Sequence, residues 1–253
     1  MHAELHKLFT VVAIANDELT EAVLRPVRSH HAFEGCVEQL ATAIRLGVYP
    51  HGSSLPPERE LADRLAVSRA TLREAIAALR TARLVETTRG RGGGTVVKHR
   101  PAAPAEGTPL DLGSRRAELL DTLVFRRIVE PGGCHIAASR ELSDQQRHLL
   151  TEAHEAVSGA ADPAVHRQAD SRFHLAIAAV TESPMTLRAI TTVQAGLHDM
   201  LNAIPVLAVN IDHSNKQHRT IYNAILKGDA ARARRVMVSH CDDTASLLRG
   251  LLG

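Results

Sequence analysis

Aromatic side chains are nearly missing from this sequence, which has no tryptophan, two tyrosines and four phenylalanines in 253 residues. Its hydrophobic cores must therefore be built mainly from Leu, Val, Ile and Ala, within an apolar fraction of 44%. Binding of single-stranded nucleic acid is disfavoured as well, because that function usually depends on aromatic platforms on which bases stack.

The sequence also lacks long apolar runs and has few cysteines. No stretch of 18 or more apolar residues occurs, so we expect no transmembrane helix and no membrane partner. The apolar run near the start has no basic region before it and no small-residue cleavage site after it, which argues against a signal peptide. The cysteines are far apart and odd in number, which predicts free thiols in a reducing cytoplasm: Cys36, Cys134 and Cys241.

Charge and histidine are unevenly distributed along a chain whose formal net charge is only +2. Residues 30–100 contain 11 Lys and Arg against 7 Asp and Glu, a balance of +4. Residues 101–253 contain 16 against 17, a balance of −1, together with nine of the 15 histidines. A basic first part and a near-neutral second part indicate a polyanion-binding module joined to a module of another kind.

Periodicity and turn residues divide the chain into a small mixed module and a larger helical one. Helical patterns cover residues 34–48, 58–67 and 68–84, and β-branched residues flank a glycine turn within 85–99. The predicted fold class is mostly α, a winged helix-turn-helix domain followed by an all-α bundle of six or seven helices. The expected divisions are an N-terminal extension of unknown role at 1–30, the winged domain at 31–99, a Pro/Ala/Gly-rich linker at 100–113 and the helical domain at 114–253.

Within the helical domain, we expect helices to end at short runs of Pro, Gly, Ser, Asn or charged residues. Such runs divide the domain into six or seven segments of helical length. They lie at 131–133, 141–143, 158–163, 183–184, 210–215 and 228–229.

Residues 58–84 have the helix-turn-helix pattern, in which the second of two short helices enters the major groove of DNA. Ser68 is well placed as the N-cap of that second helix. The helix starts with Ser, Arg and Thr, whose hydroxyl groups hold phosphates and whose guanidinium groups grip guanine. The basic run RGRGGG then adds a glycine-tipped hairpin. The alternative, an ordinary helical hairpin with a solvated charged face, accounts for neither this hairpin nor the local positive charge.

The run LPPERELADRLAVSRATLREAIAALRTARLVETTRGRGGGTVV resembles the winged helix of the GntR superfamily of bacterial transcription regulators. The resemblance covers about residues 34–99 and implies a homodimer that binds a palindromic double-stranded operator. Two positions depart from the family pattern: Ala70 replaces a frequent Thr or Ser, and Arg83 replaces a usual glycine and could alter how the chain enters the wing. The DNA-contacting positions that the resemblance implies are Arg59, Ser68, Arg69, Thr71, Arg73 and Gly90.

Four residues in the second half of the chain could together bind a metal ion. Asp170 and His174 lie one turn apart on an apolar helix, and His218 and His240 each lie beside an apolar helical stripe. One carboxylate and three imidazoles suit Zn, Ni, Mn, Co or Fe better than Ca or Mg. Spacing alone leaves the alternative open that each histidine is an ordinary hydrogen-bonded helix residue, because Asp-x-x-x-His is common by chance.

The helical part, about residues 114–250, resembles the FCD ligand-binding domain of the FadR-like branch of that superfamily. The resemblance rests on an Asp-x-x-Phe-His segment, on a serine and histidine before an apolar stripe, and on a last histidine 22 residues further on. The residues that carry it are Asp170, Phe173, His174, Ser214, His218, Ile221, Ala224, Ile225 and His240.

This second resemblance implies a metal site and a neighbouring effector pocket. The metal ligands would be Asp170, His174, His218 and His240, with zinc first among the candidate ions. Arg126 and Ser214 are implied as pocket residues, and a buried arginine offers a two-pronged grip on a carboxylate. A salt bridge from Arg126 to Glu130, one turn further on, is the alternative interpretation of that arginine.

Together these features predict a cytoplasmic transcription regulator and not an enzyme. Its operator affinity would be controlled by a small organic acid that binds at the metal site, most simply as a repressor released by its effector. Two alternatives remain open. The first is a sensor for which the metal ion is itself the signal. The second is a metalloenzyme that activates water at the Asp/His site, although no general base is evident beside it.

Overall fold

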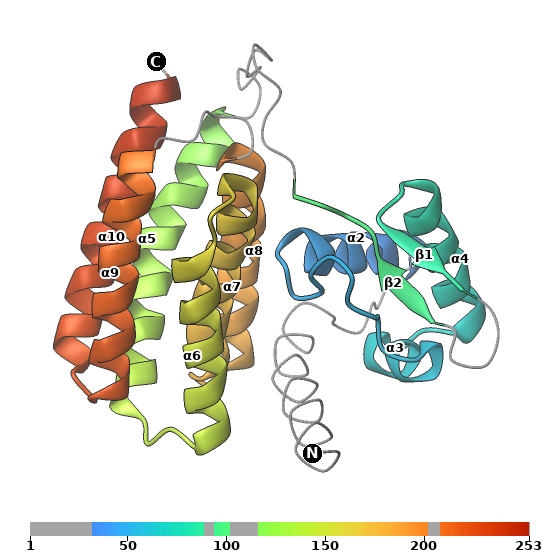
Figure 1. Ribbon diagram of the computed structural model, residues 1–253, viewed down its shortest axis with the longest axis horizontal. Coiled ribbons are helices and arrows are strands. Elements are labelled where there is room, and N and C mark those ends of the chain that lie inside the picture. The colour runs from blue at the N-terminus through green and yellow to red at the C-terminus, as the bar shows by residue number, and fades with distance from the viewer. Residues whose placement is uncertain (1–31, 89–93, 102–115, 202–207, 253) are drawn as a thin grey trace. The chain divides into compact units, whose positions relative to one another are not determined.

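The computed structural model describes residues 32–88, 94–101, 116–201 and 208–252 (Figure 1). The chain forms two compact units that divide between Pro101 and Ala102. The predicted extension at 1–30, nearly all of the predicted linker and Gly90 lie outside the described residues. Within the described ranges, the elements are helices and one two-stranded sheet, and no helix is long and apolar enough to cross a membrane.

The described part of the first unit contains three helices and a β-hairpin. Its elements are α2 (Ala32–Arg45), α3 (Glu58–Leu65), α4 (Arg69–Thr81), β1 (Val85–Thr87) and β2 (Thr95–Val97). The strands pair antiparallel, with Val85 opposite Val97. The core is aliphatic, as the shortage of aromatic residues requires, and it includes Leu40, Ile44, Leu61, Leu65, Leu72 and Leu79.

A tight turn joins α3 to α4 and completes the predicted helix-turn-helix. Helix α3 ends at Leu65, and its C-cap residue Ala66 has a left-handed φ of 52°. Ser68 then caps α4, because its hydroxyl accepts a hydrogen bond from the backbone N–H of Thr71 at 3.0 Å. The predicted N-cap is therefore confirmed. The apolar side of α4 is buried, which leaves its polar side exposed; the buried residues are Leu72, Ala75, Ile76 and Leu79.

Arg83 also lies in the left-handed region, with a φ of 59°, just before β1. A side chain in this conformation costs roughly 1–2 kcal/mol, whereas glycine adopts it freely. At the position where the resemblance leads one to expect glycine, the backbone therefore keeps a conformation suited to glycine. The arginine adds strain there.

The described part of the second unit is a bundle of six helices, which confirms the predicted fold class. Helix α5 packs against α10 and α8, α6 packs against α7, and α9 runs beside α10 (Figure 1). The three cysteines, Cys36 in α2 of the first unit and Cys134 and Cys241 in this bundle, are buried and free. The helices are α5 (Arg116–Ser139), α6 (Asp144–Gly159), α7 (Pro163–Ala179), α8 (Pro184–Leu201), α9 (Ala208–Leu226) and α10 (Ala230–Leu252).

Two of the predicted helix ends are wrong. Helix α5 continues through Pro131 and the two glycines after it, although proline inside a helix removes a hydrogen bond. Packing holds the helix together here: a Cβ on Gly133 would lie 3.2 Å from Cδ1 of Ile190, so the glycine permits close contact with α8. Helix α9 likewise contains the polar run 210–215, in which Asn215 Oδ1 lies 3.1 Å from His166 Nε2.

Candidate functional site

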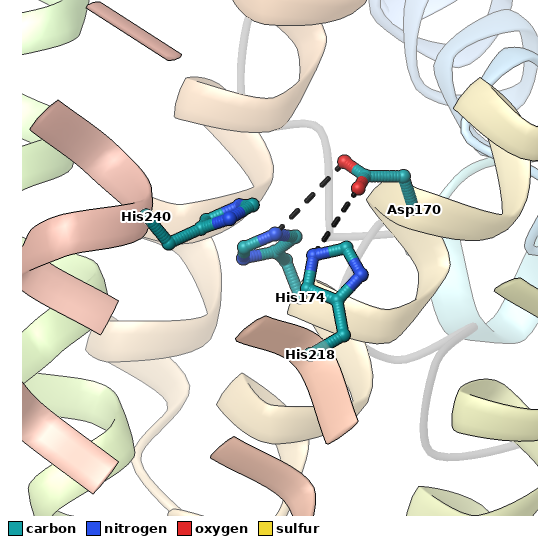
Figure 2. A group of neighbouring side chains, drawn as sticks. All are labelled: Asp170, His174, His218 and His240. Atoms are coloured by element: carbon teal, nitrogen blue, oxygen red, sulfur yellow. Dashed lines mark ion pairs between the residues drawn. The ribbon is translucent and has the colours of Figure 1, made fainter. Parts of the chain in front are cut away.

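Three helices of the second unit bring the four predicted metal ligands together (Figure 2). Asp170 and His174 come from α7, His218 from α9 and His240 from α10. Each of these residues offers one ligand atom, and the four atoms lie within 4.8 Å of one another. Metal–nitrogen bonds near 2.1 Å put donors on opposite sides of an ion about 4 Å apart, so the cluster is close to the size a metal ion requires.

The cluster is buried, and its side chains face one another. His174, His218 and His240 are 1%, 0% and 3% exposed. The Nε2 atom of His218 lies 3.3 Å from Oδ1 of Asp170, and the Nε2 atom of His174 lies 3.9 Å from Oδ2 of the same carboxylate. The carboxylate thus pairs with two imidazoles through its two oxygens (Figure 2), which is the arrangement of a shared coordination site.

Two of the three histidines, His174 and His240, have a polar neighbour close to the outward-facing ring nitrogen, which leaves the inward-facing nitrogen available. His174 Nδ1 lies 3.0 Å from Oε2 of Glu130, and His240 Nδ1 lies 3.0 Å from Oε1 of Gln217. The Nε2 atoms of His174 and His240 are buried and have no hydrogen-bond partner among the described residues. Metal-binding histidines characteristically bond through one nitrogen to an outer carboxylate or carbonyl and ligate through the other. The residues present therefore fit a metal ion.

The protonation states of His218 and His240 also favour metal binding. Burial, followed by the neighbouring His174, lowers the pKa of His218 well below its usual value. Burial, followed by the neighbouring His218 and Arg126, does the same to the pKa of His240. Both imidazoles are therefore neutral near pH 7, and a neutral imidazole has the lone pair that a metal needs.

A second buried group, centred on Glu130 of α5, supports the cluster from behind. Glu130 Oε2 accepts a hydrogen bond from Arg126 Nε at 2.9 Å, and Oε1 accepts one from Gln194 Nε2 at 2.6 Å. Burial alone would raise the pKa of the Glu130 carboxyl, but Arg126 and His174 together hold it well below its ordinary value. A buried ionised carboxylate thus fixes the ring of His174.

Arg126 makes the salt bridge of the one interpretation, and it keeps a donor that leaves the pocket role of the other a prediction. Its Nε atom makes the predicted salt bridge to Glu130, with the two side chains 2% and 1% exposed. Its Nη1 atom is buried and has no hydrogen-bond partner among the described residues. The guanidinium group of the arginine is therefore held through Nε, while its Nη1 donor remains unused.

Ser214 lies at the edge of the cluster, one turn before His218. Its Oγ atom is 3.4 Å from Nε2 of His218. It also lines a small hollow between α9 and α10, together with Asn210, His213, Gln217, His240, Asp243, Thr244 and Leu247. The hollow adjoins the histidine cluster at His240.

The candidate DNA-reading residues that the structure describes lie in the first turn of α3, where Arg59 is, and in the N-cap and first turns of α4. Arg59, Ser68, Arg69 and Arg73 are exposed, and Thr71 is half-buried. Arg73 Nε donates a hydrogen bond to Glu58 Oε2 at 2.7 Å, which ties α4 to α3. A capped helix start with exposed arginines attracts phosphate, because the helix dipole and the side-chain charge have the same sign.

Two site residues were not singled out from the sequence. The sequence indicates Glu130 only as a salt-bridge partner of Arg126, and it gives no indication of Gln217. The signal for Glu130 was its place one turn after a buried arginine on an apolar helix. Gln217 directly precedes His218, but its partner His240 is 23 residues away, so only the packing of α9 on α10 reveals the contact.

A winged helix-turn-helix unit joined to a helical unit with a buried ligand cluster defines a DNA-binding regulator with a sensor domain. Residues 34–97 match the model of the bacterial regulatory proteins of the gntR family, and residues 121–243 match the FCD domain. The HTH-type transcriptional regulator named RmpR, of Mycobacterium gastri, is 31% identical over 82% of this chain and 76% of its own. LutR of Bacillus subtilis is 25% identical over 82% of this chain and 96% of its own.

One solved structure supports the fold. Escherichia coli McbR/YncC superposes with a TM-score of 0.53 at 16% identity, over 90% of this chain and all of that one. The chain belongs to the GntR family of bacterial regulatory proteins, in the FadR-like branch that has an FCD effector-binding domain. It is a transcriptional regulator, so the metalloenzyme alternative falls away.

Proposed function

We propose that this regulator senses a small organic acid, which binds a divalent transition metal held by Asp170, His174, His218 and His240. Binding of the acid favours one arrangement of the DNA-reading units in a homodimer and so changes operator affinity. Such control requires that the acid bind the two arrangements with different affinity. The observation that carries the proposal is the pair of buried, unpartnered Nε2 atoms of His174 and His240 beside Asp170.

The metal part of the proposal follows from the cost of burying polar groups. An imidazole nitrogen that is buried without a partner destabilises the fold unless something binds it. Zinc is the first candidate, because three imidazoles and one carboxylate are ligands that it accepts readily. When bound, the ion would supply a Lewis-acid position for an oxygen atom of the effector. Glu130 and Gln217 would hold the rings of His174 and His240 toward it.

The unused donor of Arg126 supports a carboxylate effector. Its Nη1 atom is buried and unpartnered, and a guanidinium group binds carboxylates through parallel hydrogen bonds. Ser214 adds a hydroxyl group on the side of the hollow. An acid with a carboxylate and a neighbouring hydroxyl group would satisfy the metal, the arginine and the serine together.

One relative has a name that agrees with a hydroxy acid. A protein of Escherichia coli that is 30% identical is named as an L-lactate dehydrogenase operon regulatory protein. We propose a 2-hydroxy acid as the effector class and a repressor as the mode of action, since a bound dimer blocks transcription without needing any contact to polymerase.

An exposed apolar face of α5 supports the homodimer. Val124, Ile128 and Ile136 recur at multiples of four residues and are 52%, 66% and 47% exposed. A contiguous apolar face of this kind marks an interaction surface. Asp121 and His135 are seven residues to either side of Ile128, so two antiparallel copies of α5 would place each Asp121 opposite the partner's His135.

Elemental analysis combined with a thermal-shift screen tests this function. Purified protein is expected to contain about one metal ion per chain, and 2-hydroxy acids are expected to raise its melting temperature because they bind only the native state. His218→Ala should lose the metal and the shift, whereas His148→Ala, an exposed histidine on α6, should keep both. A protein that binds no metal would overturn the proposal.

The metal-only sensor gives a different result in the same experiment. In that case the metal would raise the melting temperature and alter DNA affinity, and no acid would add to either effect. The salt bridge between Arg126 and Glu130 is the feature that favours this alternative, because it already occupies part of the guanidinium group.

A further inference from the structure

A chain of hydrogen bonds leads from the buried histidine cluster to the surface of α10. Gln217 Oε1 lies 3.0 Å from His240 Nδ1, and Gln217 Nε2 lies 2.7 Å from Asp243 Oδ2. His213 Nε2 reaches the same oxygen of Asp243 at 2.9 Å. His240 is buried, whereas the side chains of Asp243 and His213 are 48% and 60% exposed. These hydrogen bonds therefore connect a proposed metal ligand to groups in contact with solvent.

In each hydrogen bond of this series, only one of the two groups can be the donor. The hydrogen bond from His213, which is the largest influence, lowers the pKa of Asp243, so the carboxylate is ionised and can only accept. Gln217 must therefore turn its NH₂ group toward Asp243. Its carbonyl oxygen then faces His240 and can only accept, so His240 carries its proton on Nδ1 and leaves a lone pair on Nε2.

We propose that Asp243, acting through Gln217, sets the metal affinity of the cluster by fixing which ring nitrogen of His240 carries the proton. The inference rests on the proposed metal site and extends it to two residues that touch no metal. Both are positioning residues. His174 is held in the same way by Glu130, but that carboxylate is buried, whereas Asp243 can be reached from solvent.

Reversing the direction of the hydrogen bonds tests the proposal without changing the size of any side chain. In Asp243→Asn the new amide can donate, so Gln217 is free to turn over and present its NH₂ group to His240. That arrangement favours the proton on Nε2, the nitrogen that must ligate. Loss of an outer partner of a metal ligand typically weakens binding about 10–100-fold. We expect the dissociation constant for zinc to rise by about tenfold or more in Asp243→Asn.

A second substitution should restore affinity. In the double variant Gln217→Glu with Asp243→Asn, the carboxylate at 217 can only accept, from Asn on one side and from His240 Nδ1 on the other. The lone pair then returns to Nε2, and zinc affinity should return to near the wild-type value. Asp242→Asn is the matched control, because it makes the same chemical change at the adjacent residue. The carboxylate of Asp242 pairs with Arg127, whereas Gln217 bonds to Asp243.

Two measurements on the full-length protein decide the outcome. Zinc affinity is measured by competition with a chromophoric chelator, and the tautomer of His240 is read from ¹⁵N chemical shifts of the metal-free protein. Weaker binding in Asp243→Asn, recovery in the double variant and an unchanged control would support the proposal. Unaltered zinc affinity and an unaltered tautomer in Asp243→Asn, or no recovery in the double variant, would overturn it. Wild-type protein that binds no zinc but shows the Nδ1–H tautomer would instead refute the metal site and leave the tautomer assignment standing.

Discussion

Single residues determine the chemistry of the cluster, because burial and hydrogen bonds fix the protonation state of each imidazole. Burial lowers the pKa values of His218 and His240 well below the usual range, and the neighbouring histidines and Arg126 lower them further. In the metal-free protein these neutral imidazoles make the free energy of unfolding depend on pH.

Acid should destabilise the helical unit of the metal-free protein. Below about pH 6.5 the histidines of the unfolded chain take up protons while the folded ones stay neutral, so the free energy of unfolding falls as pH falls. The loss is expected to be about 2 kcal/mol per histidine between pH 6.5 and 5. Urea unfolding measures it, with Tyr222 as the only fluorescent reporter of this unit in a Tyr49→Phe background.

His240→Gln should lose about half of this pH dependence, whereas the exposed control His148→Ala should keep it. An unfolding free energy that is flat between pH 7 and 5 would show that both buried rings accept protons in the folded state.

Backbone strain in the helix-turn-helix gives a second prediction at this scale. Ala66 is exposed and has a φ of 52°, so its Cβ contributes strain and no packing. Ala66→Gly should leave the unfolding free energy of the winged unit unchanged or raise it by up to about 1 kcal/mol. Ala77→Gly, inside α4, should lower it by about 1 kcal/mol. Tyr49 fluorescence in a Tyr222→Phe background reports this unit, and equal losses in both variants would refute the strain.

The sequence predicted the residues of the site better than their supporting contacts. Asp170 and His174 share a helix, so their proximity follows from a spacing of four. The links of Glu130 to His174 and of Gln217 to His240 join different helices, and no local pattern encodes them. They depend on how α5, α9 and α10 pack, which a single sequence does not specify.

At the scale of elements, the assignment of α4 as the helix that reads DNA can be tested. Arg69 lies at its exposed start, and Arg80 lies in its last turn. Arg69→Ala should remove the sequence preference of operator binding at the base it contacts, at a cost of about 1–3 kcal/mol per contact, while leaving fold and metal content intact. Arg80→Ala is the matched control and should retain sequence preference in an electrophoretic shift assay. A retained preference in Arg69→Ala would refute the assignment.

The exposed face of α5 makes the other prediction at this scale. Ile128→Glu places two carboxylates at the centre of the proposed two-fold contact, so the variant should be monomeric by analytical ultracentrifugation. Arg116→Glu, an exposed change at the start of the same helix and outside that centre, should remain dimeric. An Ile128→Glu protein that is still dimeric would show that the copies meet elsewhere.

Helix boundaries illustrate where sequence patterns stop being sufficient. Pro131 with its glycines predicts a break, and so does the polar run 210–215, yet both lie inside helices. In each case tertiary contacts outweigh the local preference: Gly133 lets α8 approach, and Asn215 pairs with His166. Breaks at 141–143, 158–163, 183–184 and 228–229 hold because their Gly, Pro and Ser residues also begin or end the neighbouring helices.

For the whole molecule, the central claim is that an acid bound in the helical unit changes what the winged unit does. The two units belong to one chain and one family of regulators, so the coupling must appear as a change in DNA affinity. Metal, acid and DNA can each be varied independently, which separates this claim from a metal-only sensor.

The most direct measurement is the affinity of the full-length, zinc-loaded protein for an operator obtained by sequence selection, with and without L-lactate and other 2-hydroxy acids. Fluorescence anisotropy should show that at least one acid changes the dissociation constant for DNA by about tenfold, within the usual range of allosteric coupling. In His218→Ala the same acid should have no effect, while DNA affinity without acid stays near the wild-type value. An acid response that survives in His218→Ala, or a response to zinc that no acid alters, would contradict the claim.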